Sequence, residues 1–102
     1  MSPQLNHDEI YTFKLLSGEE IVARLVCKYA DHYEIKQPIS MVLGPQGLQM
    51  MPSLFSSNPD KNTLINMHSI AMASEPRMDV RDKYVEATTG IAVPGSKQII
   101  TG

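Results

Sequence analysis

The chain has a single cysteine, Cys27, and no long apolar run anywhere in its 102 residues. One cysteine excludes a disulfide within the chain. A membrane-spanning helix needs roughly 20 consecutive apolar residues, so we expect no membrane partner. The first residues, Met1 to Asn6, contain neither the basic cluster nor the apolar stretch of a secretory signal. These absences predict a soluble protein of the cytoplasm.

An excess of charge of one sign is also lacking. The formal net charge is −2 at pH 7, with 9 Lys and Arg side chains against 11 Asp and Glu. A protein that binds polyanions over its whole surface is strongly basic, so any contact with nucleic acid has to be local. The length is that of one domain, and a hydrophobic fraction of 42% is normal for a globular chain.

Recognised catalytic and metal-binding patterns are absent. The three histidines, His7, His32 and His68, are scattered with no metal-ligand spacing. The GPQG turn at residues 44–47 lacks the Lys-Ser/Thr pair of a phosphate-binding loop. We therefore expect a protein that is not an enzyme and that has no cofactor and no metal site.

What the sequence does contain is a series of long strands in its first half. Apolar and polar residues alternate through Ile10–Leu16 and Glu20–Tyr29, and a third strand is expected over His32–Leu43. Short turns join them, at Ser17-Gly18 and at Ala30-Asp31. Pro38 lies within the third strand and removes one backbone donor, so we expect a bulge or a split there.

The alternation also predicts the core. One face of the first three strands carries most of the apolar side chains, and we expect them to line a single interior: Phe13, Leu15, Ile21, Leu25, Cys27 and Ile35. A small apolar side chain is the commonest role of a lone cysteine in such a pattern, so Cys27 is expected to be buried.

The second half of the chain is less regular. Two further strands are predicted, over Leu48–Met51 and Thr63–Ala73, with a loop at Ser53–Asn62 between them. A short helix is expected at about Arg77–Thr88, with Ser74 as its N-cap, and Lys97–Thr101 is a candidate extra strand. The chain thus divides into a lead-in (1–9), a barrel (10–73), and a C-terminal helix and tail (74–102).

The segment from Ile10 to Ala73 resembles the Sm-like family, which includes Sm, LSm and bacterial Hfq proteins. The run from Leu15 to Ala23, LLSGEEIVA, is similar to the opening of the first Sm motif, and Asp31 and Tyr33 stand at its Asp and aromatic positions. The run from Ile65 to Ile70, INMHSI, falls where the second motif lies. The chain resembles in particular the divergent Sm-like proteins attributed to cyanophages in marine metagenomes, which would place it in the cytoplasm of a host cell.

This resemblance implies a mostly β fold: a small, strongly bent five-stranded Sm-like (SH3-like) barrel with a short additional C-terminal helix and tail. It also implies a homo-oligomeric ring. Physical chemistry points the same way, because the fourth and fifth strands of such a barrel leave open apolar edges, and copies of the chain can pair them.

The resemblance further implies a pore face that binds single-stranded RNA. The residues expected there are Asp31, His32, Tyr33, Lys36, Asn66 and His68. Tyr33 either stacks on a base or packs on the core. The chain departs from the motifs at two places, because Ile35 replaces the Asn of the first and Asn66-Met67 replaces the Arg-Gly of the second. The alternative function is a ring that serves as an assembly or adaptor protein and makes protein contacts without nucleic acid.

Overall fold

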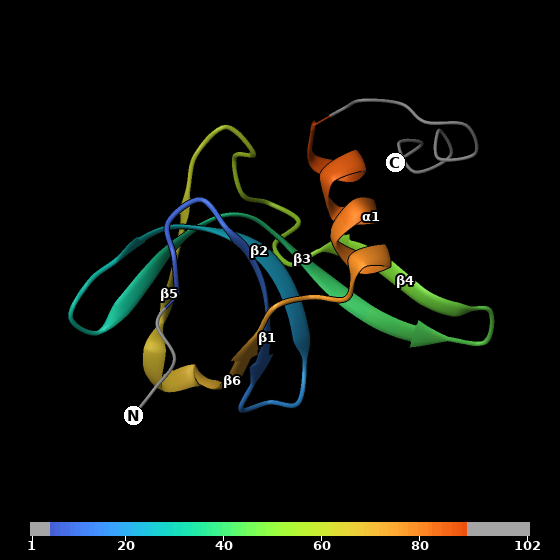
Figure 1. The fold of residues 1–102 in the computed structure, drawn as a ribbon, viewed down its shortest axis with the longest axis horizontal. Helices are drawn as coiled ribbons and strands as arrows, with labels where there is room; N and C mark the ends of the chain where they lie inside the picture. Colours follow the sequence, from blue (N-terminus) through green and yellow to red (C-terminus); the bar gives the residue numbers. More distant parts are fainter. Residues whose placement is uncertain (1–4, 90–102) are drawn as a thin grey trace.

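The computed structural model of the protein describes residues 5–89. It is mostly β, with one C-terminal helix, as the sequence predicts (Figure 1). The elements in chain order are β1 (Ile10–Leu15), β2 (Glu20–Lys28), β3 (His32–Gly44), β4 (Gly47–Pro52), β5 (Thr63–Asn66), the 3-10 turn η1 (Met67–Ser69), β6 (Ile70–Ser74) and α1 (Met78–Thr89). The candidate strand at Lys97–Thr101 lies outside the described residues. No helix within residues 5–89 is both long and apolar enough to cross a membrane.

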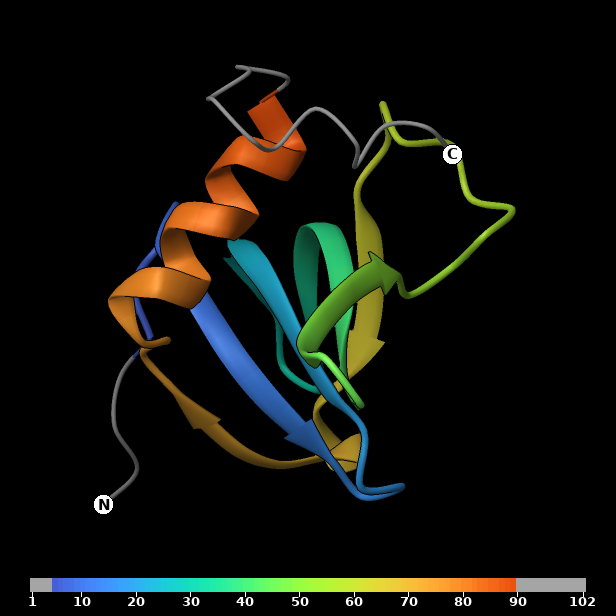
Figure 2. The ribbon, with the colours of Figure 1, turned by 90° about the vertical axis from the view of Figure 1, so that its right-hand side faces the viewer.

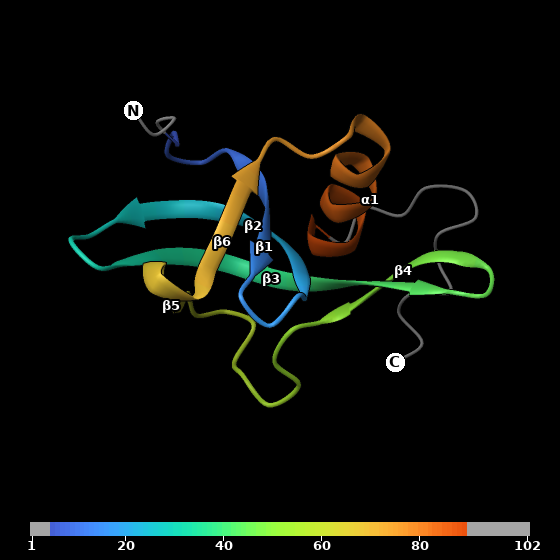
Figure 3. The same cartoon turned by 90° about the horizontal axis from the view of Figure 1, so that it is seen from below.

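The strands form one antiparallel sheet in the order β4-β3-β2-β1-β6, and β5 pairs with the first half of β3. Seen from below, β6 lies over β1, and η1 carries the chain from β5 to β6 (Figure 3). The sheet is barrel-like in its bending but is not closed. The expectation of a small, strongly bent five-stranded barrel is therefore met only in part, as a bent antiparallel sheet that has six strands.

The sixth strand arises because the predicted strand Thr63–Ala73 is broken in its middle by η1. Asn66 causes the break. Its side-chain oxygen accepts a hydrogen bond from the His68 N–H at 2.8 Å, and its carbonyl accepts one from the Ser69 hydroxyl at 2.7 Å. An Asn side chain that bonds the backbone two residues on favours a turn over a strand, so a continuous strand was the wrong prediction.

β3 bends sharply where the sequence predicted an irregularity. Gln37 adopts φ of 50°, and the pair Gln37-Pro38 stands opposite the single residue Ala23 of β2. This is a bulge, which bends a strand and increases its twist. It separates β3 into two halves, one paired with β2 and β5 and the other paired with β2 and β4.

The main core lies on the concave side of the bent sheet. Its buried side chains are Tyr11, Phe13, Ile21, Ala23, Leu25 and Ile35, and Leu15 packs against them while partly exposed. Most of the predicted core is therefore confirmed. Cys27 is the exception, because it is only half-buried and belongs to neither of the two clusters of buried apolar residues described within 5–89.

The cause is a second bulge, this time in β2. Leu25 faces Ile35, but the next paired residue of β2 is Cys27, which faces Glu34. Val26 is the extra residue. An added residue reverses the direction of the side chains that follow it, so Cys27 lies on the outer face beside Glu34.

The outer face of the sheet is covered by α1, which lies against one side of the strands (Figure 2). A second core forms there from Ile10, Val22 and Tyr84, with Ile39 and Met41 among the side chains packed around it. This explains why Val22 is fully buried although it alternates away from the main core. The helix begins at Met78, within one residue of the prediction, whereas Ser74 ends β6 and is not its N-cap.

Candidate binding site at the β2–β3 turn

The structure brings the two motif regions together at one end of the sheet. The turn at Ala30-Asp31 is a tight hairpin, in which the Tyr29 N–H donates to the His32 carbonyl at 2.8 Å. His32 stands opposite Asn66 in the pairing of β3 with β5. The Met67 N–H donates to the Asp31 carbonyl at 3.0 Å, which joins the hairpin to η1. Four of the six predicted site residues, Asp31, His32, Asn66 and His68, therefore lie near one another.

The most exposed aromatic surface in this region is a pair of rings, of which the sequence predicted His32 as a site residue but missed Tyr29. The rings of Tyr29 and His32 are stacked, with centroids 4.7 Å apart and planes inclined by 18°. Tyr29 is 45% exposed. The sequence could have indicated this pair, because Tyr29 and His32 flank the two-residue turn Ala30-Asp31. Residues that flank such a turn stand directly opposite each other.

Acidic and amide side chains surround this stack. His32 Nδ1 lies 2.7 Å from Asp31 Oδ1. The Tyr29 hydroxyl donates to one oxygen of Glu34 at 3.0 Å, and the Asn62 amide donates to the other at 2.7 Å. We call the whole group the turn cluster, and it consists of Tyr29, Asp31, His32, Glu34, Asn62, Asn66 and His68.

These contacts fix the charge of the two carboxylates. The hydrogen bond with His32 holds the pKa of Asp31 below its usual value, and the charge of His68 acts in the same direction. Hydrogen bonds from Asn62 and Tyr29 hold the pKa of Glu34 below its usual value. Hydrogen bonds to the side chains of Cys27 and Glu34 raise the pKa of Tyr29 to about 12. At neutral pH the cluster thus combines two ionised carboxylates with the neutral phenol of Tyr29.

Two predicted site residues lie apart from the cluster. Tyr33 is half-buried and packs against the main core, with its ring centroid 6.2 Å from that of Phe13. Lys36 is exposed on β3, next to the bulge, and its carbonyl accepts a hydrogen bond from Tyr84 at 2.7 Å. Of the two roles considered for Tyr33, packing on the core is therefore present in the structure.

The cluster can stack a planar ring on Tyr29 and His32 and can accept hydrogen bonds at Asp31 and Glu34. No group of three or more His, Cys, Asp or Glu side chains within residues 5–89 is placed to hold a metal ion.

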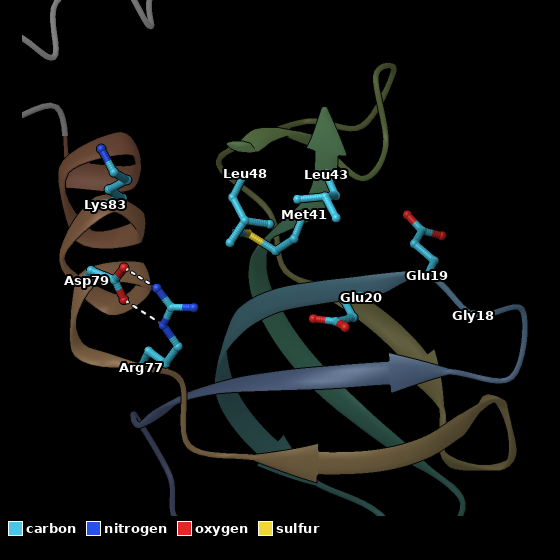
Figure 4. Close-up of a pocket in the computed structure, with 9 residues that line it drawn as sticks. All are labelled: Gly18, Glu19, Glu20, Met41, Leu43, Leu48, Arg77, Asp79 and Lys83. Atoms are coloured by element: carbon cyan, nitrogen blue, oxygen red, sulfur yellow. Dashed lines mark hydrogen bonds and ion pairs between the residues drawn. The ribbon is translucent and has the colours of Figure 1, made fainter. Parts of the chain in front are cut away.

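A concave surface lies at the other end of the sheet, between α1 and the hairpin of β3 and β4 (Figure 4). This groove has a volume of about 820 Å³. Its lining comes from three places: the start of β2 with the residues before it, the β3–β4 hairpin, and α1 with Arg77 just before it.

No protein-family model matches this chain, and no curated protein matches it.

Proposed function

We propose that this chain is a non-catalytic, ring-forming protein of the Sm-like type that binds single-stranded RNA at the turn cluster. The observation that carries the proposal is the hydrogen bond from the Met67 N–H to the Asp31 carbonyl. It joins the two segments that resemble the two Sm motifs, although they are more than thirty positions apart in the sequence.

The exposed strand edges support the ring. Within residues 5–89, β6 pairs with β1 on one side only, and β5 pairs only with β3. Each carries a large apolar side chain in solvent, Leu64 at 63% and Met72 at 68% exposure. Unpaired apolar edges attract another strand, and an edge of one copy that pairs with a different edge of the next makes a contact that repeats around a ring.

The stacked pair supports RNA as the ligand. A base that stacks on an aromatic side chain gains about 1–3 kcal/mol, and bases of single strands are free to do so. Tyr29 and His32 present such a surface, and the exposed part of Tyr33 and the Lys36 ammonium lie further along β3. The cluster lacks the arginine of the second Sm motif, since Asn66 stands there and cannot neutralise a phosphate. We therefore expect weaker binding than that of a ring with both motifs complete.

The test is a salt titration of labelled oligo-U and oligo-A binding. A nucleic-acid ligand should lose affinity linearly in a plot of log affinity against log salt. Tyr29→Ala should weaken binding at least about tenfold, equivalent to about 1.4 kcal/mol, and Tyr33→Ala tests the alternative stacking residue. Phe55→Ala is the matched control, because Phe55 is an aromatic residue with 81% exposure outside the cluster.

The second candidate is an adaptor ring that makes protein contacts without nucleic acid. The observation that favours it is the pair of ionised carboxylates, Asp31 and Glu34, beside the stack, because negative charge repels a phosphate backbone. Absence of oligonucleotide binding at every salt concentration would rule out the RNA proposal and leave the adaptor. Binding that persists unchanged in both tyrosine variants would place the RNA site outside the turn cluster.

A further inference from the structure

The groove between α1 and the β3–β4 hairpin has an exposed apolar floor. Met41, Leu43 and Leu48 form it, and Leu43 and Leu48 are 80% and 48% exposed (Figure 4). Exposed leucines that gather in a concave surface are uncommon unless another segment covers them. The floor is therefore a candidate docking surface.

The rim of the groove carries charge of both signs. On the helix side, Arg77 is bound at two points to Asp79, at 2.6 and 3.1 Å, so its charge is already paired, and Lys83 adds a positive charge further along α1. On the opposite side lie Glu19 and Glu20. Glu19 accepts a hydrogen bond from the neutral Ser40 hydroxyl, and Glu20 is 3.5 Å from Lys14. The β2 side of the groove thus carries two carboxylates against the one ammonium of Lys14, and it suits an occupant with an apolar part and a cation.

The chain itself supplies such an occupant in residues 90–102. They follow directly on Thr89, the last residue of the helix that forms one wall of the groove. Their sequence, GIAVPGSKQIITG, has Lys97 as its one charged residue, with Ile99 and Ile100 close behind it. The charge complements the Glu19–Glu20 rim, and the isoleucines complement the leucine floor.

Residues 90–102 are long enough to reach back from the end of α1 to the groove. A helix of 12 residues is about 18 Å long, whereas the eight residues from Thr89 to Lys97 can span about 26 Å when extended. A tethered segment also has an effective concentration in the millimolar range, so modest contacts suffice to hold it.

We propose that residues 90–102 bind in the groove of their own chain, with Lys97 beside Glu19 and Glu20 and with Ile99 and Ile100 on Leu43 and Leu48. This contact shields the apolar floor. A protein with an apolar and basic segment has to displace it in order to bind there. The inference is independent of RNA binding, because the groove and the turn cluster share no residue.

Disulfide trapping in the full-length chain tests the contact. In a Cys27→Ala background, Leu48→Cys is combined with Ile99→Cys, and Leu43→Cys with Ile99→Cys is a second pair. The control pair is Lys61→Cys with Ile99→Cys, because Lys61 is exposed on the loop between β4 and β5 and does not line the groove. The rate of intrachain disulfide formation in dilute protein with oxidised glutathione is followed by mass spectrometry.

We expect both groove pairs to close at least tenfold faster than the control pair. Replacing Glu19 and Glu20 with Lys should slow closure several-fold, and adding Lys97→Glu should restore it. Equal rates for the groove and control pairs would overturn the proposal. A disulfide between chains, formed when single-cysteine Leu48→Cys and Ile99→Cys proteins are mixed, would also overturn it, because the occupant would then come from a second copy.

Discussion

At the scale of single residues, the most consequential side chain outside the turn cluster is Tyr84. It is 1% exposed, and its hydroxyl lies between two strands. The hydroxyl accepts a hydrogen bond from the Arg24 N–H at 3.1 Å and donates one to the Lys36 carbonyl at 2.7 Å. Arg24 and Lys36 face each other across β2 and β3 at the edge of the Gln37-Pro38 bulge. Tyr84 thus fastens α1 to the sheet where the bulge disturbs the strand pairing.

We predict that Tyr84→Phe lowers the free energy of unfolding by about 1–3 kcal/mol, because it leaves the Arg24 N–H and the Lys36 carbonyl without this partner. Urea denaturation measures the change. Tyr29→Phe is the matched control, since its hydroxyl is exposed and bonds a side chain in solvent, and its effect should be smaller. Equal effects of the two substitutions would mean that the Tyr84 hydroxyl does not hold the strands together.

The same burial predicts a loss of stability at alkaline pH. Burial raises the pKa of Tyr84 to about 12 from its ordinary value of 10.0. Above pH 10 the unfolded chain releases this proton while the folded chain retains it, so stability falls as the pH rises from 10 to about 12 and then levels off. The slope for one such group is at most about 1.4 kcal/mol per pH unit. Denaturation series at pH 9 to 12 should show the decline.

The contribution of Tyr84 is separable from that of Tyr29. The pKa of Tyr29 is also raised to about 12, by its hydrogen bonds to Cys27 and Glu34. Its ionisation therefore also lowers the stability of the fold between pH 10 and about 12. Tyr84→Phe should therefore remove the larger part of the decline, and Tyr29→Phe a smaller part, because the Tyr29 hydroxyl is screened by solvent. An unchanged pH dependence in Tyr84→Phe would contradict the argument from burial.

At the scale of elements, alternation was sufficient to locate the strands but not to orient every side chain. Phe13, Ile21, Leu25 and Ile35 are buried as predicted, because β1 and the adjoining parts of β2 and β3 keep a strict period of two. Beyond Leu25 the extra residue Val26 reverses the pattern and turns Cys27 outward. A bulge at Pro38 was predictable, since proline cannot donate to the ladder. The bulge at Val26 carries no such marker in the sequence.

Only some residues of the turn cluster could likewise be predicted from the sequence. A resemblance to the Sm motifs placed Asp31, His32, Asn66 and His68 in one site, and the structure brings these four together. Glu34 and Asn62 were missed because they meet across the β3–β5 pairing, at a separation of 28 positions. No pattern along the chain joins a residue of the loop at Ser53–Asn62 to one on β3.

At the scale of the whole molecule, the sheet is buried on both faces in its centre and open at its margins. The main core fills one face, and α1 covers the other through Val22 and Tyr84. The sequence predicted the helix but not its place, because periodicity describes a helix and says nothing of which sheet face it covers. With both faces occupied, the strands left as edges within residues 5–89 are β4, β5 and β6, at which another copy of the chain can add. Leu64 lies in solvent on β5, and Met72 lies in solvent on β6.

The ring proposal is best tested at Met72. Ile70 is unsuitable, because it packs against the main core, and a lysine there would disturb the fold as well as the edge. Met72 is 68% exposed on β6, so Met72→Lys should leave the subunit folded. Within a ring it would bury a charge against the edge of the neighbouring copy, where Leu64 offers it no partner, and an unpaired buried charge is strongly unfavourable.

We therefore predict that light scattering at micromolar concentration shows a single species several-fold larger than the 11.3 kDa chain, and that Met72→Lys shifts it toward the monomer. Met78→Lys is the matched control, because Met78 is equally exposed, at 69%, but lies on α1 away from the strand edges. It should leave the assembly intact.

A wild-type protein that scatters as a monomer would remove the basis for the ring. If the wild type is an oligomer that neither substitution disturbs, the copies join at a surface other than β6. In that case the groove beside α1 becomes the next interface to probe, because its leucine floor is the other exposed apolar surface described above.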